Sequence, residues 1–240
     1  LKSQQEKLLL TERHEAWENV ARKLAHEIKN PLTPIQLTID RLKTKYEKSI
    51  DTNEKENFLN YLQTIIKQIK QIESLVNEFS DFARMPKPIL QNCDIIEIIQ
   101  NNISLLREFD ESISVKLNCK NSELFLKCDF DQISRVFLNI IKNSIESIQE
   151  KSQKNGEFAK IIDIEILNNN DYITANITDS GTGFPKENIK NIIKPYFTTK
   201  PSGSGLGLSI VNKIINDHNG SVKFNSNNNG AKVEVTLPKY

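Results

Sequence analysis

A histidine and a glutamate stand side by side in the segment AHEIKNPLTPIQ, residues 25–36. Apolar residues recur around them at steps of three and four, which predicts a helix. His26 lies two residues from both Leu24 and Ile28, so it is turned roughly 200° from the apolar stripe and is expected to face water. An exposed imidazole can act as a nucleophile when Glu27 accepts the proton of one ring nitrogen. A solvated surface histidine is the alternative interpretation.

Two prolines follow the histidine within the same predicted helix. Pro31 has no N–H to donate to the carbonyl of Glu27, and Pro34 has none for the carbonyl of Asn30. We therefore expect the helix to bend and loosen just below His26, where a nucleophile could meet more than one partner. A plain packing kink is the alternative.

A second group of chemically competent residues lies in DSGTGFP, residues 179–185. This segment follows an alternating strand, so the Asp179 carboxylate sits at a strand end, where it can accept a hydrogen bond from an amino group. Gly181 and Gly183 would let the backbone approach a flat ligand. An ordinary Asp-Ser-Gly turn is the alternative.

The segment GSGLGLSIVNKII, residues 203–215, places Gly203, Gly205 and Gly207 just before an apolar-periodic helix. Free amide groups at a helix start, together with the positive end of the helix dipole, favour a bound phosphate. The segment is not a P-loop, because no Gly-Lys-Ser/Thr follows. Its spacing also excludes a dinucleotide-binding fingerprint.

Asn139 and Asn143 lie one turn apart on the predicted helix DQISRVFLNIIKNSIESI. Asparagine is mildly unfavourable within helices, so a pair on one face calls for a reason. An amide oxygen is a hard ligand that suits Mg²⁺ together with phosphate oxygens and water. Two polar residues on a solvated face are the alternative.

The first third of the chain must hold His26 in place, and its pattern is helical throughout. Two apolar stripes, separated by a polar break around residues 49–53, predict a helical hairpin. Each helix has one narrow stripe and little else to bury it, so we expect two hairpins to pack as a four-helix bundle in a homodimer. The stripes consist of Val20, Leu24, Ile28, Leu32, Ile35, Ile39, Leu42 and Tyr46, and of Phe58, Leu62, Ile65, Ile69, Ile72, Val76 and Phe79.

The prolines of ARMPKPI, residues 83–89, predict the end of the second helix and a domain boundary after residue 85. The rest of the chain predicts an α/β sandwich with mixed strands and its helices on one face. We expect Asp129 to cap the helix over residues 130–150. The other predicted helices cover 95–109 and 208–217, and the predicted strands cover 112–118, 123–127, 161–167, 172–178, 221–225 and 232–237.

Composition limits the possible partners. The 240 residues include 32 basic and 31 acidic side chains, and a net charge of +1 provides no field for nucleic acid. Three cysteines without a CxxC pair suit a reducing compartment, and we interpret Cys93, Cys119 and Cys128 as core thiols. No apolar run approaches the roughly 18 residues of a spanning helix, so we expect no membrane contact within this chain. The chain begins within a helical pattern, as a fragment would.

The order of these motifs resembles the two-component sensor histidine kinases. A His-Glu helix with Asn30-Pro31 is followed by the asparagine helix, then by Asp-x-Gly-x-Gly, KPYFTTK at 194–200 and Gly-x-Gly-x-Gly before a helix. The segments EAWENVARKLAHEIKNPLTPIQL and FARMPKP are similar to NtrY-type nitrogen-regulation kinases. The resemblance implies a multidomain α and α/β protein, with a dimerisation and histidine phosphotransfer hairpin over 1–85 and a GHKL-type ATP-binding sandwich over 86–240.

By this resemblance, His26 is the phosphoacceptor, Glu27 polarises it, and Asn30 orients a water when the kinase acts as a phosphatase. Asn143 would bind Mg²⁺ with help from Asn139, and Asp179 would recognise the adenine amino group. Residues 186–202 would form a mobile lid over ATP. The remaining implied nucleotide-binding residues are Gly181, Gly183, Phe197, Lys200, Gly203, Gly205, Leu206 and Gly207.

The sequence departs from the family pattern at two positions. Ser144 stands where alanine is usual after the asparagine, and Asn219 stands where the family has glycine. We expect the neighbouring His218 to be structural and His14, which has no motif around it, to be solvated.

The implied function is autophosphorylation of a histidine from ATP and transfer of the phosphoryl group to an aspartate of a response regulator with an NtrX-like receiver domain. Phosphatase activity towards that regulator is also implied. The family further implies a cytoplasmic location for this part of a protein anchored in the bacterial inner membrane. Two other classes remain open, namely a GHKL ATPase without phosphohistidine and a non-catalytic dimeric scaffold.

Overall fold

The computed structural model describes residues 2–107, 110–185, 189, 191–200, 203–227 and 229–239, with side chains from residue 20 onward except at 52, 53, 107, 155 and 227. The chain divides into two compact units, formed mainly by residues 1–86 and by residues 87–199 with 205–240. Each unit has its own apolar core. Among the described residues, no helix combines the length and apolar character needed to cross a membrane.

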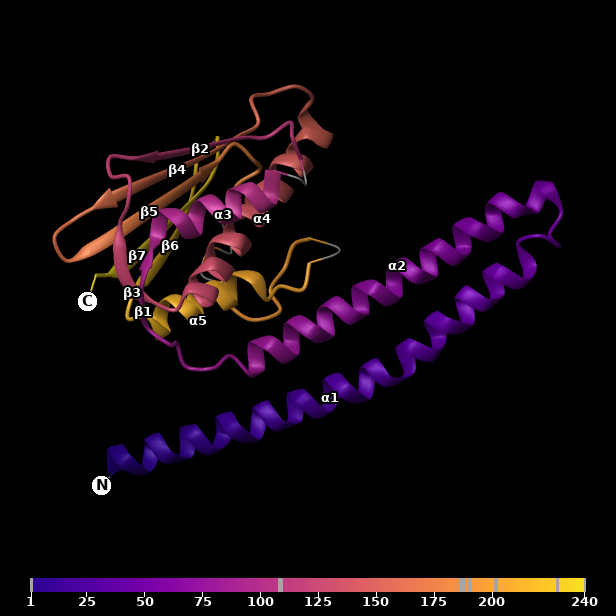
Figure 1. Cartoon of the computed structure of the whole chain (residues 1–240), viewed down its shortest axis with the longest axis horizontal. Coiled ribbons are helices and arrows are strands. Elements are labelled where there is room, and N and C mark those ends of the chain that lie inside the picture. Colours follow the sequence, from indigo (N-terminus) through magenta and orange to yellow (C-terminus); the bar gives the residue numbers. More distant parts are fainter. Residues whose placement is uncertain are drawn as a thin grey trace. The chain divides into compact units, whose positions relative to one another are not determined.

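The first unit is a hairpin of two long helices, α1 over Lys2–Tyr46 and α2 over Thr52–Ala83 (Figure 1). α1 continues through Pro31 and Pro34 as one helix, so neither proline ends it. The hairpin core consists of Leu32 and Ile39 from α1 and Leu62 and Ile69 from α2, with Phe58 and Ile66 packed against it. α2 ends at Ala83, where the sequence predicts its end.

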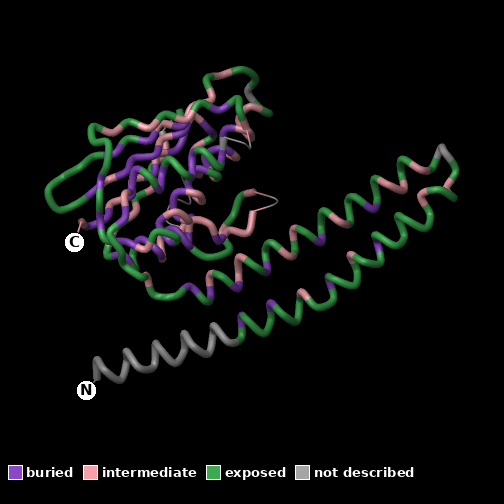
Figure 2. Tube along the Cα trace, in the orientation of Figure 1, coloured by how far each residue is buried: buried purple, intermediate pink, exposed green. Residues whose placement is uncertain are grey.

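Only part of each predicted apolar stripe is buried, and exposed positions alternate with buried ones along both helices (Figure 2). The buried stripe residues are Leu32 and Ile39 of α1 and Leu62, Ile69 and Val76 of α2. Alanines contribute more to the α1 core than the sequence suggests, because Ala21 and Ala25 are buried while the larger Val20 and Leu24 are about half exposed. The exposed large apolar side chains are Val20, Leu24, Ile28, Ile35, Leu37, Leu42 and Tyr46 on α1, and Tyr61, Ile65, Ile72 and Leu75 on α2.

The second unit is a five-stranded mixed sheet with order β2-β4-β5-β7-β6, and helices α3, α4 and α5 lie on one face of it (Figure 1). β2 and β4 are parallel, and the other neighbours are antiparallel. A separate two-stranded ribbon pairs β1 with β3. The strands are β1 Gln91–Asp94, β2 Ser114–Cys119, β3 Phe125–Cys128, β4 Ile161–Asn168, β5 Tyr172–Asp179, β6 Ser221–Asn227 and β7 Gly230–Pro238, and the helices are α3 Ile95–Arg107, α4 Phe130–Asn155 and α5 Gly207–Asp217.

These elements confirm the predicted sandwich, with ends shifted by a few residues. β1 was not predicted, because QNCD is too short to show alternation and becomes a strand only through pairing with β3. Residues 108 and 109, the predicted end of α3, lie outside the described residues. Cys93 and Cys128 are buried as expected, and burial raises the pKa of the Cys128 thiol, but Cys119 is only half-buried because it ends β2.

Asp129 caps α4 as predicted, because its Oδ1 accepts a hydrogen bond from the Gln132 N–H at 3.0 Å. Its Oδ2 accepts another from the Ile89 N–H at 2.9 Å, which ties the segment after α2 to the start of α4. The Asp129 N–H donates to His218 Nε2 at 3.0 Å, while His218 Nδ1 lies 2.8 Å from the Ile214 carbonyl. The buried His218 therefore joins the end of α5 to the start of α4.

Candidate functional site

The His26, Glu27 and Asn30 side chains are exposed on α1. His26 was predicted to face water opposite a buried stripe, but Leu24 and Ile28 of that stripe are exposed as well. Adjacent residues of a helix point about 100° apart, so Glu27 does not stack directly over the imidazole. The exposed ring is accessible to an incoming electrophile. The proposed proton acceptance by Glu27 stays a prediction.

α4 brings the two asparagines to the start of α5. A Cβ placed on Gly207, the first residue of α5, would lie 3.2 Å from Asn139 Oδ1 and 3.7 Å from Asn143 Nδ2. Asn139 also donates from Nδ2 to the Arg135 carbonyl at 2.8 Å, which fixes its rotamer. Both amides therefore lie near a helix N-terminus, where the first backbone N–H groups have no hydrogen-bond partner within the helix.

Asp179 ends β5 and is buried, with 6% of its surface exposed. Its Oδ1 accepts hydrogen bonds from the Gly181 N–H at 2.9 Å and the Ala231 N–H at 3.1 Å. Because two backbone donors share Oδ1, the other carboxylate oxygen retains acceptor capacity for a ligand.

Burial raises the pKa of the Asp179 carboxyl above its ordinary value. The hydrogen bonds from Ala231, Gly181 and Ser144 and the charge of Lys151 all act in the opposite direction, but burial outweighs them. Burial thus favours the protonated carboxyl, whereas the hydrogen bonds and the charge of Lys151 favour the ionised form.

A second face of α4 supports the loop after Asp179, and sequence reasoning missed it. Ser147 Oγ accepts from the Thr182 N–H at 2.9 Å, and Lys151 Nζ donates to the Ser180 carbonyl at 2.7 Å. Gly181 lies so close to Ser147 that any Cβ there would collide with it. Ser147 and Lys151 lie four residues apart on one face of α4, which was the one available signal.

The loop before α5 depends on Gly205, whose φ of 69° belongs to the left-handed region. A Cβ at this position would also strike the backbone of Tyr196 and Phe197. Leu206 is buried, with 1% of its surface exposed, and its carbonyl accepts the Ser209 hydroxyl at 2.8 Å. Gly205 thus packs the start of α5 against the segment that carries Phe197.

Part of the predicted lid lies outside the described residues, namely 186–188, 190, 201 and 202. Of the described part, Ile192 is buried and Phe197 is half-buried. Lys200 and Gly203 close a local turn, in which the Gly203 N–H donates to the Lys200 carbonyl at 3.2 Å. Their role at a nucleotide stays a prediction.

The second unit thus joins a carboxylate acceptor at a strand end to two amides at a helix N-terminus. The acceptor suits a base with an amino group, and the helix start suits phosphate. The described part of the chain holds no cluster of three or more histidine, cysteine or acidic side chains that would bind a metal by itself. A hard cation here would need phosphate oxygens and water beside the Asn143 amide, as Mg²⁺ commonly has.

Because burial raises the pKa of Asp179, we expect Asp179→Asn to resist urea better than the native chain at about pH 7. A raised folded-state pKa favours folding below the unfolded value, and this contribution is lost as the pH rises through the folded value. The difference in stability between the variant and the native chain should therefore shrink as the pH falls towards 3.8, the ordinary pKa of an aspartate. Urea midpoints at about pH 5 and pH 7, followed by circular dichroism, measure it. A native chain that is more stable than the variant at neutral pH would contradict this balance.

Comparison with protein families assigns both regions. Residues 16–88 match the His Kinase A phospho-acceptor domain. Residues 128–240 match the histidine kinase-, DNA gyrase B-, and HSP90-like ATPases. The first range contains His26, and the second contains the asparagines of α4 and Asp179.

Two relatives are similar over nearly the whole chain. A putative NtrY-like sensor histidine kinase of Rickettsia bellii is 36% identical over 236 residues, which cover 98% of this chain and 37% of that protein. The nitrogen regulation protein NtrY of Azorhizobium caulinodans is 37% identical over 240 residues, which cover 96% of this chain and 30% of that protein. The chain thus spans well under half the length of these relatives.

Solved structures agree with the fold. Histidine kinase ThkA, crystallised with response regulator protein TrrA, matches with a TM-score of 0.67 at 25% identity, covering 100% of this chain and 67% of that one. Full-length ShkA in complex with AMPPNP matches with a TM-score of 0.71 at 19% identity, covering 92% of this chain and 45% of that one. By its phospho-acceptor and ATP-binding domains, the chain belongs to the two-component sensor histidine kinases, which are ATP-dependent protein-histidine kinases, and it is similar to their NtrY-like members.

Proposed function

We propose that this chain phosphorylates itself on His26 with the γ-phosphate of ATP and passes the phosphoryl group to a response regulator. Residues 1–85 would serve as the dimerisation and phosphotransfer domain and residues 86–240 as the ATP-binding domain. Two observations together support the proposal: the Asn139 and Asn143 amides lie at the start of α5, and the buried Asp179 carboxylate lies at the end of β5. These groups suit the phosphates and the base of one adenine nucleotide.

In the first step, an imidazole nitrogen of His26 attacks the γ-phosphorus, the bond to the β,γ-bridging oxygen breaks, and ADP leaves. The imidazole loses its ring proton, for which the Glu27 carboxylate is the nearest acceptor in sequence. In the second step, a receiver carboxylate attacks phosphorus and the N–P bond breaks. The exposed position of His26 suits both steps, because each brings a different partner to the same ring.

The ATP-binding domain positions the nucleotide through separate contacts. Asp179 would accept from the 6-amino group, and the N-terminus of α5 would face the phosphates. Asn143, helped by Asn139, would hold Mg²⁺, which supplies charge neutralisation of the phosphates when bound. Phe197, Lys200 and the glycines at 203, 205 and 207 would close the nucleotide pocket, with residues 186–202 as its lid.

Incubation with γ-labelled ATP and Mg²⁺ should leave acid-labile, alkali-stable label on the native chain and none on His26→Gln. The variant should still bind ATP, because His26 belongs to the other domain. Asn143→Ala is the matched control that should lose labelling together with nucleotide affinity. An ATPase without phosphohistidine would turn over ATP equally well in the His26→Gln variant, and a non-catalytic scaffold would stay unlabelled throughout.

The outward-facing apolar stripes support a homodimer. Ile35 and Ile72 are each more than 40% exposed in the single chain, on the two helices that form the hairpin. Burial of such stripes against a second hairpin would complete a four-helix bundle, and apolar area removed from water is stabilising at about 25 cal/mol per Å².

Ile35→Glu combined with Ile72→Glu should convert the dimer to a monomer, because it would bury charges without partners. Thr44→Glu is the control on the same helix, since nine residues at about 100° each place it roughly 180° from Ile35. Light scattering measures the mass in solution. A dimer that persists in the double variant would place the dimer interface elsewhere.

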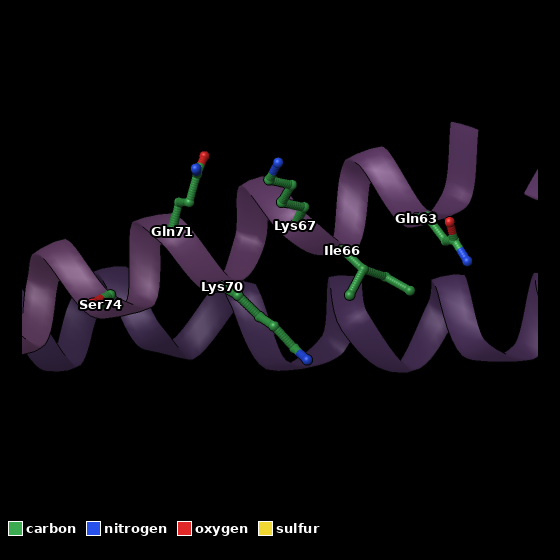
Figure 3. A pocket seen from close by; sticks show the side chains of 6 residues that line it. All are labelled: Gln63, Ile66, Lys67, Lys70, Gln71 and Ser74. Atoms are coloured by element: carbon green, nitrogen blue, oxygen red, sulfur yellow. The ribbon is translucent and has the colours of Figure 1, made fainter. Parts of the chain in front are cut away.

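A shallow groove of about 400 Å³ lies along α2, and we propose that the regulator's receiver domain docks there. It is lined by Gln63, Ile66, Lys67, Lys70, Gln71 and Ser74. Figure 3 shows Lys67 and Gln71 extending to one side of α2 and Ile66 and Lys70 to the other. The two lysines suit the acidic phosphorylation site of a receiver, and the groove lies in the same hairpin as His26.

Lys70→Glu should slow phosphoryl transfer to an NtrX-like receiver domain, because it reverses a charge in the groove, while labelling of His26 continues. Asn30→Ala should remove dephosphorylation of the phosphorylated receiver, because the side chain that would orient water is lost. Single-turnover transfer and phosphate release measure the two effects. If Lys70→Glu and Lys70→Ala both transfer the phosphoryl group to the receiver at the rate of the native chain, the groove is not the docking site.

Since the chain spans only part of its relatives' length, we also propose that the full-length protein is anchored in the bacterial inner membrane with this part in the cytoplasm. The support is the family alone. Membrane fractionation of the full-length protein is the direct measurement.

A further inference from the structure

The ammonium group of Lys151 on α4 contacts three segments of the second unit that are far apart in the sequence. Its Nζ donates to the Ser180 carbonyl at 2.7 Å, in the loop after β5, and to the Asn229 carbonyl at 3.3 Å, in the turn between β6 and β7. It also lies 4.9 Å from the centre of the Phe158 ring, in the segment between α4 and β4. The side chain therefore holds the loop and the turn together on α4.

These two segments carry the backbone donors of the Asp179 carboxylate. The Gly181 N–H, which donates to Asp179 Oδ1 at 2.9 Å, belongs to the residue after the first carbonyl that Lys151 contacts. The Ala231 N–H, which donates to the same oxygen at 3.1 Å, lies two residues after the second carbonyl. Lys151 thus fixes the chain next to each of the two donors.

The turn between β6 and β7 also packs directly on the backbone of Asp179. A Cβ placed on Gly230 would collide with the Asp179 carbonyl oxygen. β6 makes a further contact with the loop, because the Phe184 N–H donates to Ser226 Oγ at 3.0 Å, but this bond lies further along the loop than Gly181. Lys151 acts where the loop and the turn both meet Asp179, so it opposes any shift of the two donors relative to the carboxylate.

A cation suits this position for an electrostatic reason as well. Burial raises the pKa of the Asp179 carboxyl, and the charge of Lys151 acts against that shift. An ionised carboxylate only accepts hydrogen bonds, so it suits the amino group of a base. A neutral side chain without donors would neither bond the two carbonyls nor favour the ionised acceptor.

We propose that Lys151 is a positioning residue that holds the loop after β5 and the turn between β6 and β7 in the arrangement in which Asp179 accepts a hydrogen bond from the 6-amino group of adenine. This role rests on the proposed function, in which Asp179 contacts the base. Lys151 acts through Asp179 and its two backbone donors, so its loss should weaken recognition of the base. Binding of the phosphates should persist, because the Asn139 and Asn143 amides lie at the start of α5.

The test compares ADP with purine riboside 5′-diphosphate, which carries the same phosphates but lacks the 6-amino group. Isothermal titration with Mg²⁺ gives the dissociation constant of each ligand for the native chain, Lys151→Met, Lys151→Gln, Lys151→Arg and Lys154→Met. Methionine keeps a long apolar stem but has no donor. Lys154 is the matched control on α4, because its Nζ pairs at 2.6 Å with Glu150 of the same helix, and both side chains are largely exposed.

We expect the native chain to bind ADP about tenfold more tightly than purine riboside 5′-diphosphate, the effect of one hydrogen bond to a charged group. Lys151→Met should lose most of this ratio, because ADP binding weakens while binding of the other ligand stays nearly unchanged. Lys151→Arg keeps a cation with several donors and should retain more of the ratio than methionine does. Lys154→Met should match the native chain.

A native ratio in Lys151→Met, or an equal loss of affinity for both ligands, would overturn the role of Lys151 and leave the contact between Asp179 and the base in place. A native chain that binds both ligands equally would instead overturn that contact, and the role of Lys151 with it. Lys151→Gln loses the charge and part of the reach, so it provides the same comparison if circular dichroism shows that the methionine variant does not fold.

Discussion

A carboxylate can be buried only where the fold supplies donors to it, and the second unit is built around one such group. Asp179 ends the central strand β5, and its backbone donors come from two separate places in the chain, the loop that follows it and the start of β7. Side chains of α4 hold that loop through the Thr182 N–H and the Ser180 carbonyl. The register of the sheet and the packing of α4 on it therefore determine the surroundings of this carboxylate, beyond their contribution to stability.

α4 contacts different parts of the second unit at successive positions along its length. Its first turn is capped by Asp129, which also holds the Ile89 N–H of the segment after α2, and its middle carries the asparagines that face Gly207. Lys151, two turns beyond Ser144, holds the loop after Asp179. α4 thus contacts the segment at Ile89, the start of α5 and the loop after Asp179.

The hairpin is held together by a simpler pattern of apolar contacts between two helices. Its core is a short ladder of aliphatic side chains between two helices, and the remaining apolar side chains stay exposed in the single chain. A narrow two-helix interface leaves the polar face of α1 free, so His26 remains open to solvent. The same narrow interface that leaves apolar side chains exposed on both helices also leaves the His26 imidazole exposed.

Periodicity and spacing in the sequence determined the hairpin, the class of the sandwich, the cap at Asp129 and the residue types of the site, because each depends on neighbours within a few positions. The tertiary structure alone decided that β1 is a strand, that Ala21 and Ala25 are buried where Val20 and Leu24 are exposed, and that Ser147 and Lys151 support the Asp179 loop. These features arise from contacts between residues far apart in the chain. A hydroxyl or an ammonium group on a helix carries no local sign of the strand end against which it will pack, so only the folded arrangement could reveal its partner.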